Sequence, residues 1–322
     1  EMCIRDRVTP ALDGSATLIA ATSTGLWSRT GAFTEDADWQ RVAFSPQGFS
    51  TYANAYCSDV VWNDRGLWVT LVGTGAAGHD GVYRSTNGLA GPFTAIALPN
   101  LETGARLSLG EAPHATTRMY VLGKRPSPTD PANNTGHAHL WQIDVSAAAA
   151  NVREVQNFPV GLFVSEVKLT GGNLIITKRD QSDYDQAIAV RQVGGNDVVS
   201  VGGSLESNGG AWDAALFDLT ITTAAGNLTT NFTAANQTNP AADAATFIGA
   251  GIHPDVHFVR NAGAALWVGC DGGVFHRSGG NNRSMNAGLA SAEPGIIASH
   301  PTLDGPVLAG TQDNGAIQRI GD

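Results

Sequence analysis

The stretch Leu266-Trp-Val-Gly-Cys-Asp-Gly-Gly-Val-Phe-His-Arg277 decides the fold class. Two apolar runs flank its central Asp-Gly-Gly. An Asp-Gly or Asn-Gly pair between such runs is a strong signal for a β-hairpin, because the turn needs residues that adopt positive φ. The stretch therefore predicts two antiparallel strands joined by a tight turn at Gly273.

The same unit recurs along the chain. Further copies lie at Thr17–Arg29, Leu67–Ser85 and Val307–Arg319. When the copies are aligned on their turn glycines, a large residue with high strand propensity stands two positions later each time: Trp27, Tyr83, Phe275 and Ile317. Weaker copies are aligned on Gly136 and Gly203. A repeat of this kind predicts a repeat architecture with six units.

The apolar runs are nearly continuous rather than alternating, which is typical of strands whose two faces are both covered. Sheets stacked radially between two neighbours meet that condition. We therefore expect an all-β chain forming a β-propeller of six visible blades, either as a six-bladed propeller or as part of a seven- or eight-bladed ring. Residues 1–7 have the character of a non-native leader, and 8–322 are expected to form one domain with loop insertions near 124–136 and 223–245.

Composition excludes several classes of function. Lys and Arg number 19 against 29 Asp and Glu, which gives a net charge of −10 and argues against binding to nucleic acid or to an anionic membrane. The sequence contains no apolar run long enough for a transmembrane helix. The three cysteines fit neither a disulfide scaffold nor a zinc site. We expect a monomer.

Four pieces of the C-terminal part carry a family resemblance: His253–His257, Val268–Phe275, Met285–Leu289 and Ala309–Gly315. This region resembles secreted bacterial propellers with BNR or Asp-box-like repeats, which are related in architecture to sortilin-type and xyloglucanase-type propellers. Ser85-Thr-Asn-Gly88, with Phe93 downstream, is similar to a degenerate Asp-box. The resemblance implies an extracellular or periplasmic location. It identifies a fold rather than a reaction.

The spacing of His253, Asp255 and His257 marks the first candidate site. On a strand, residues at i, i+2 and i+4 share one face. Two imidazoles and a carboxylate on one face could bind a divalent metal or a ligand, or perform acid–base chemistry. The alternative is a structural network, because buried polar residues of neighbouring sheets commonly bond to each other.

Other candidates are more scattered. Asp183 and Asp185, together with Asp255, are weak candidates for catalysis, since a carboxylate pair can hydrolyse a glycosidic bond. Trp212 lies in a Gly-rich segment and is the expected exposed platform for a ligand. Ligand-binding candidates in the last repeat are Gln312 and Asp313. Asp271 and Asp313 stand at hairpin turns, where a carboxylate usually bonds its own backbone two residues on. No cofactor is expected, and calcium is considered only as a scaffold ion, because a lone turn carboxylate supplies too few oxygen ligands.

Two functions from different classes follow. The first is a binding module that recognises a glycan, polymer or protein through loops on one face. The second is a glycoside hydrolase of the xyloglucanase or sialidase type, which requires two carboxylates converging in a central cleft.

Overall fold

The structure is a computed structural model. It describes the residues 7–10, 17–30, 39–42, 56–72, 80–126, 137–164, 167–176, 180–208, 211–287, 294–299, 307–311 and 316–319. Strands account for nearly all regular structure in these residues, and the other elements are three single 3₁₀ turns: η1 (Gly88–Ala90), η2 (Ala234–Asn236) and η3 (Pro240–Ala242). The predicted all-β fold is confirmed. None of the described segments forms a helix long and apolar enough to cross a membrane.

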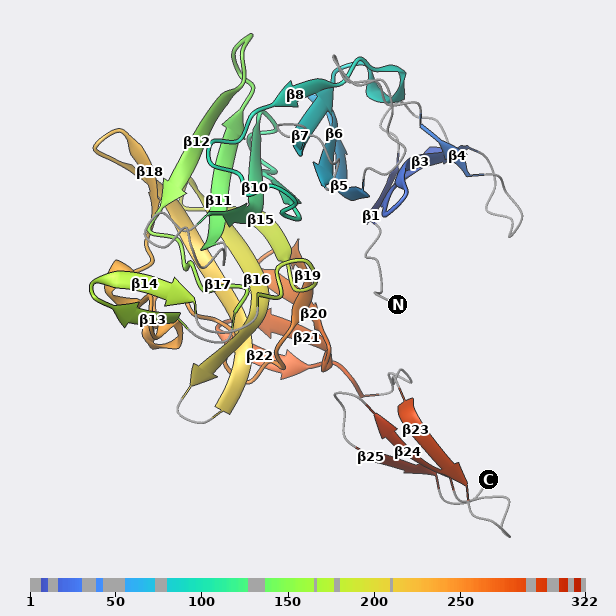
Figure 1. The fold of residues 1–322 in the computed structure, drawn as a ribbon, viewed down its shortest axis with the longest axis vertical. Helices are drawn as coiled ribbons and strands as arrows, with labels where there is room; N and C mark the ends of the chain where they lie inside the picture. The colour runs from blue at the N-terminus through green and yellow to red at the C-terminus, as the bar shows by residue number, and fades with distance from the viewer. Residues whose placement is uncertain are drawn as a thin grey trace.

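Antiparallel sheets follow one another along the chain (Figure 1). The first contains β1 (Arg7–Pro10), β2 (Thr17–Thr22), β3 (Gly25–Thr30) and β4 (Gln40–Arg41). The second contains β5 (Tyr56–Asn63), β6 (Gly66–Val72), β7 (Gly81–Ser85) and β8 (Thr94–Ile96). The third contains β9 (Ser108–Glu111), β10 (Arg118–Arg125), β11 (His137–Asp144) and β12 (Asn151–Gln156).

After a separate hairpin, the same order continues. The hairpin is β13 (Val167–Thr170) with β14 (Asn173–Ile176). The fourth sheet contains β15 (Ala187–Val193), β16 (Asn196–Asn208), β17 (Ala211–Ala224) and β18 (Asn227–Thr230). The fifth contains β19 (Val256–Ala262), β20 (Ala265–Cys270), β21 (Gly273–Ser278) and β22 (Asn281–Ser284). The last contains β23 (Pro294–Ser299), β24 (Val307–Thr311) and β25 (Ala316–Arg319).

The predicted hairpins form where the glycine-anchored units lie. Each of the four clear copies pairs as two adjacent antiparallel strands, β2 with β3, β6 with β7, β20 with β21, and β24 with β25. Gly25, Gly81 and Gly273 have φ of 121°, 147° and 106°. Residues that carry a side chain rarely adopt these backbone angles, which explains why glycine stands at the start of the third strand in each of these sheets.

The alignment on Gly203 is wrong. Gly203 lies inside β16, at a bulge in the pairing with β17, and β16 continues to Asn208. A Cβ atom on Gly203 would lie 2.0 Å from the carbonyl oxygen of Leu162. The glycine is therefore required by a close approach of two backbones rather than by a turn.

The two predicted loop insertions have different outcomes in the structure. The polar stretch 223–245 is not one long loop: it contains the end of β17, the strand β18 and two 3₁₀ turns. β18 completes the fourth sheet and also pairs in parallel with β12, so it joins the third and fourth sheets. The stretch 124–136 lies outside the described residues from position 127 onward. Arg7, assigned to the leader from sequence, begins β1.

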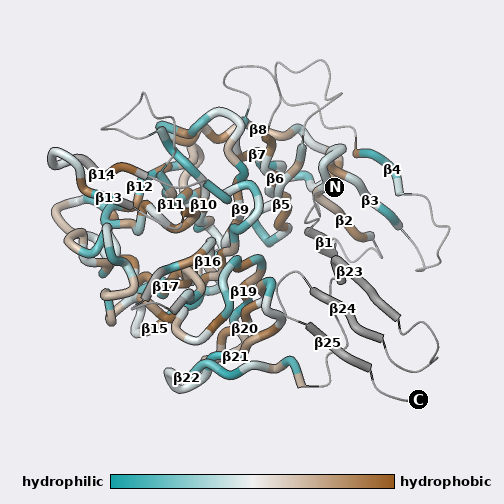
Figure 2. The backbone as a smooth tube through the Cα atoms, turned by 60° about the horizontal axis from the view of Figure 1, so that its bottom comes forward, coloured by the Kyte–Doolittle hydropathy of each residue, from teal (hydrophilic) through white to brown (hydrophobic). Residues whose placement is uncertain are grey.

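Hydrophobic clusters fill the space between consecutive sheets. Four clusters cover the interfaces from the first sheet to the fifth, one cluster per interface. The first strands of neighbouring sheets contact each other, β5 with β9, β9 with β15, and β15 with β19. Every residue of β6 is buried, as its continuous apolar run predicts. Figure 2 shows the opposite character at the outer strands β4 and β22, which are hydrophilic.

Candidate functional site

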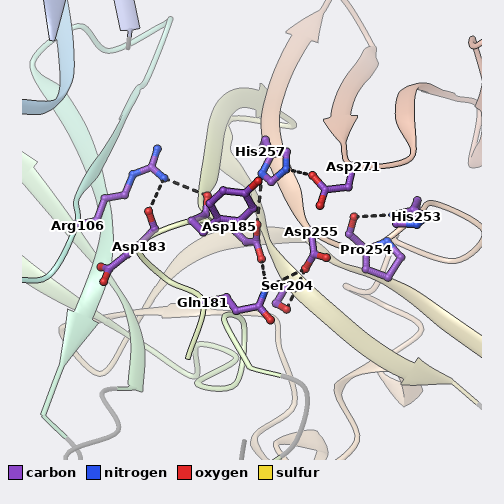
Figure 3. A network of polar contacts seen from close by, with 11 residues as sticks. Arg106, Gln181, Asp183, Asp185, Ser204, His253, Pro254, Asp255, His257 and Asp271 are labelled. Carbon is purple, nitrogen blue, oxygen red and sulfur yellow. Dashed lines mark hydrogen bonds and ion pairs between the residues drawn. The ribbon is translucent and has the colours of Figure 1, made fainter. Parts of the chain in front are cut away.

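One edge of the fourth and fifth sheets gathers polar side chains. Val256, at the start of β19, pairs with Cys270, at the end of β20. Because antiparallel neighbours run in opposite directions, the start of the first strand and the end of the second share an edge. His257 and Asp271 therefore come together there, and Asp185, just before β15, joins them from the fourth sheet (Figure 3).

His257 lies between two carboxylates. Its Nε2 atom contacts Oδ1 of Asp271, and its Nδ1 atom lies 3.3 Å from Oδ1 of Asp185. The ring of Tyr184 meets the imidazole edge to face, with ring centroids 5.1 Å apart. Asp185 is fully buried, whereas the side chains of His257 and Asp271 are 18% and 15% exposed. The imidazole therefore links the two sheets through contacts that a positive charge strengthens.

A glutamine extends this network to Asp255. Nε2 of Gln181 donates to Oδ2 of Asp185 at 2.7 Å and to Oδ1 of Asp255 at 3.3 Å. Asp255 has φ of 62°, its backbone N–H donates to the carbonyl of Ser204, and the Ser204 hydroxyl donates back to its carboxylate at 3.2 Å. The positive φ is uncommon for a non-glycine residue and is held by these bonds.

The turn that carries Asp185 is fixed from the third sheet. Nη1 of Arg106, just before β9, donates to the backbone carbonyls of Asp183 and Tyr184 at 3.2 and 3.1 Å. Nζ of Lys124, near the end of β10, donates to Asp180 at 2.9 Å. Burial lowers the pKa of Lys124, but the charge and hydrogen bond of Asp180, together with the charges of Glu102 and Asp183, outweigh burial and raise it. Three consecutive sheets thus contribute to one polar face.

Only part of the predicted histidine motif enters the network. β19 begins at Val256, so His253 and Asp255 precede the strand, and the expected alternation on one face is wrong. Nδ1 of His253 contacts the carbonyl of Pro254, and His257 faces Asp271 instead. Within the described ranges, no group of three or more His, Cys, Asp or Glu side chains is arranged to hold a metal ion.

The other predicted residues are separated. Asp183 is exposed while Asp185 is buried, so these two carboxylates do not face the same space. Trp212 is 72% exposed, which confirms its predicted exposure, and its role in ligand binding stays a prediction. Gln312 and Asp313 lie outside the described residues.

Three residues of this polar network were not predicted from the sequence. The sequence alone indicates that Asp271 is a turn residue bonded to its own backbone, although the β19–β20 register places it beside His257. It indicates no role for Gln181 or Arg106, which act between segments far apart in sequence. The register of the β19–β20 hairpin could have revealed Asp271, because the turn between Ala262 and Ala265 fixes which residues of β19 lie opposite the end of β20.

Glu206 is a buried acid on the β16–β17 hairpin near this edge. It is 7% exposed and lies opposite Asp213 in the strand pairing. Burial raises the pKa of Glu206 to about 8, so its carboxyl group is mostly protonated in the folded protein at neutral pH.

We expect Glu206→Gln to remove a pH dependence of stability. The pKa of Glu206 is higher in the folded than in the unfolded chain. Glu206 therefore contributes fully to stability below its unfolded-state pKa, near 4.5, and this contribution is lost as pH rises toward 8. Between pH 6 and pH 7.5 the wild-type free energy of unfolding should fall relative to the variant by about 2 kcal/mol. Urea unfolding of both proteins at the two pH values measures this difference. A gap that is the same at both values contradicts the prediction.

Comparisons with known proteins give remote likenesses. No model of a protein family matches the chain, and no curated protein matches it. An ancestral GH74 enzyme matches at 15% identity and TM-score 0.49, over 98% of this chain and 41% of that one. The AfRom2 CNH domain matches at 9% and 0.37, over 97% and 92%, and the N-terminal domain of Nup159 at 10% and 0.36, over 99% and 90%.

These neighbours are β-propeller proteins. The chain spans less than half of the length of the GH74 enzyme that it matches. Their identities to this chain do not exceed 15%, and their TM-scores lie below 0.5.

Proposed function

We propose that the protein is a β-propeller binding module, with the six sheets as its blades, that recognises a glycan, polymer or protein through loops at the polar edge described above. The proposal includes a monomer in an extracellular or periplasmic location. The observation that carries it is the exposed indole of Trp212 on β17, which pairs with β16, the strand whose Ser204 bonds the polar network. Ser207 lies opposite Trp212 in the β16–β17 hairpin. Trp212 is therefore roughly 10 Å along the strands from Ser204, which bonds Asp255.

The buried members of the network support positioning rather than chemistry. Asp185 is fully buried, and its oxygens meet Gln181 and His257. Such a carboxylate holds its neighbours in place. The groups left at the surface, above all the indole and the carboxylate of Asp183, are those that can contact a ligand. A large aromatic side chain is a common anchor of binding surfaces, and Trp212 is held on a paired strand.

The test is binding by the purified chain to an array of polysaccharides, followed by titration of any polymer it retains. We expect Trp212→Ala to weaken binding by about 30-fold, since a central aromatic anchor contributes about 2 kcal/mol. The matched control is Trp39→Ala, because Trp39 is 37% exposed and lies just before β4 of the first sheet. Equal affinity of wild type and Trp212→Ala, or an equal loss in Trp39→Ala, would overturn the proposal.

One observation favours the alternative, a glycoside hydrolase. Gln181 bonds both Asp185 and Asp255, so the bonded oxygens lie within about 6 Å of each other, near the separation that glycosidases use. The alternative predicts release of reducing ends from a polysaccharide panel, and loss of that release in Asp255→Asn. Absence of any hydrolysis by the wild-type chain would remove it.

A further inference from the structure

We propose that a groove on the second sheet binds a neutral saccharide, through the indole of Trp62 and the polar side chains of the turns beside it. This site goes beyond the proposed function and does not depend on it, because it lies away from the polar edge. The groove has a volume of about 590 Å³, within the range of sites for small ligands. Its apolar surface comes from Trp62 and Leu89, and its polar surface from Asp64, Thr86 and Asn87.

Two short segments form the walls of the groove. One is the turn between β5 and β6, and the other is the segment after β7 that contains η1. Gly66 lets them approach, since a Cβ atom there would lie 2.2 Å from the carbonyl oxygen of Ser85. Arg84 then fixes the turn, because its Nε and Nη2 atoms donate to the carbonyl of Arg65 at 2.8 and 2.5 Å. The walls are therefore in place before a ligand arrives, which lowers the cost of binding.

Trp62 lies between these walls. Its ring is half-buried and packs against the hydrophobic cluster that joins the first and second sheets. A Cβ atom on Gly88 would lie 2.5 Å from Cζ2 of the indole, so glycine brings the η1 turn directly onto the ring. The Nε1 atom of Trp62 bonds no described residue and is not enclosed, so its N–H is open to solvent. An anchored indole with a free N–H can contact both the C–H groups and a hydroxyl of one sugar ring.

The polar side chains of the groove supply partners for further hydroxyl groups. The carboxylate of Asp64 is 60% exposed, and Nε of Arg65 lies 3.9 Å from it. Nδ2 of Asn87 donates to the carbonyl of Gly91 at 3.2 Å, which leaves Oδ1 as an acceptor. Thr86 is exposed, and its hydroxyl both donates and accepts. Because a sugar presents several hydroxyls on a compact ring, it can use these donors and acceptors together.

The charges around the groove disfavour an ionic ligand. Asp64 and Arg65 offset each other in part, and the guanidinium of Arg84 is already bonded to a carbonyl. An anion would meet the carboxylate of Asp64 and the net charge of −10. A cation would find only one exposed carboxylate, and such pairs contribute little in water. The charges therefore favour a neutral ligand rich in hydroxyls, with an organic cation as the competing outcome of the test.

The groove and the polar edge lie at opposite ends of the strands. Ser58, near the start of β5, donates to the carbonyl of Leu107 at 2.8 Å, next to the arginine that fixes the polar edge. Trp62 lies four residues further on, roughly 13 Å along the strand. Nδ2 of Asn63 then donates at 3.4 Å to the carbonyl of Thr116, between β9 and β10. A ligand in the groove thus leaves the polar edge free.

The experiment follows the Nε1–Hε1 resonance of Trp62 by nuclear magnetic resonance while maltotriose, cellotriose or mannotriose is added to the full chain. Trp62→Phe assigns the resonance. We expect a saturable shift with at least one of these neutral trisaccharides, with Kd on the order of 1 mM, as for a single shallow site. Glycerol at equal hydroxyl concentration and tetramethylammonium chloride are titrated in parallel.

Two variants separate binding from a structural role. Trp62→Phe keeps a ring on the cluster but loses the N–H, and we expect affinity, followed through the amide of Gly88, to fall at least about fivefold. Asp64→Ala removes an exposed acceptor, and we expect a loss of about threefold. The matched control is Trp212→Phe, which changes an exposed indole at the polar edge, and we expect it to titrate like wild type.

The proposal is overturned if none of the three trisaccharides moves the Trp62 resonance, or if glycerol moves it as far. Tighter binding of tetramethylammonium than of any trisaccharide overturns the assignment of a neutral ligand. The wild-type titration decides these points even if Trp62→Phe fails to fold. It is also independent of the polysaccharide test with Trp212→Ala, because the two experiments report on opposite ends of the strands and either can fail alone.

Discussion

Replacing Asp185 by alanine should destabilise the protein by about 3 kcal/mol or more, because it removes one partner from a buried, charged network. Asp185 is fully buried and accepts a hydrogen bond from Gln181 at 2.7 Å. Its other oxygen lies 3.3 Å from Nδ1 of His257. The variant removes the shorter of two hydrogen bonds from the amide of Gln181 and one of two carboxylate contacts from the imidazole of His257, and a buried polar group that loses a partner bears part of its desolvation cost.

Urea unfolding at neutral pH measures this effect. Asp183→Ala is the matched control, since Asp183 lies two positions away in the same turn but is exposed, and we expect it to change stability by less than about 0.5 kcal/mol. Asp185→Asn should fall between the two, because an amide can still accept from Gln181 but has no charge for His257. If Asp185→Ala and Asp183→Ala were equally stable, the network would not hold the two sheets together.

The strands and their turns could be predicted from sequence because the signal is local. Gly273 and the apolar runs beside it lie within a dozen positions, so the turn type and the pairing follow from neighbouring residues alone. Gly203 misled the alignment for a physical reason. Its requirement comes from the backbone of Leu162, about 40 positions earlier, and no local pattern encodes such a contact.

The site was predicted only in part for the same reason. His257, Asp255 and Asp185 were chosen for their side-chain chemistry, and the structure brings these three into one network. What joins them is Gln181, which carries no charge and belongs to no motif. Its role depends on the packing of the fourth sheet against the fifth, which spacing within one strand cannot give.

The predicted metal site assumed a regular strand over 253–257, and the chain does not form one there. A strand over 253–257 would place both histidines on one face, but Asp255 has positive φ, and the chain turns before β19 begins. Pro254 also has no N–H to give to a strand pairing. The same turn carries Asp255 to Ser204 and leaves His253 at the carbonyl of Pro254.

The largest effect on stability outside the site should come from Trp141→Ala, at about 3–5 kcal/mol. Trp141 is fully buried on β11, in the cluster that fills the space between the second and third sheets. Its Nε1 atom donates to the carbonyl of Pro99 at 3.0 Å, and its ring meets His139 edge to face. Alanine leaves both a large cavity and an unpaired carbonyl, and neither sheet can close the gap without disturbing its next interface.

Trp212→Ala is the control, because that indole is 72% exposed and its removal should cost less than about 1 kcal/mol. Urea unfolding of the two variants against wild type gives the comparison, with tryptophan fluorescence replaced by circular dichroism because each variant loses a chromophore. A cost below about 1 kcal/mol for Trp141→Ala would mean that the second and third sheets are not packed through this cluster.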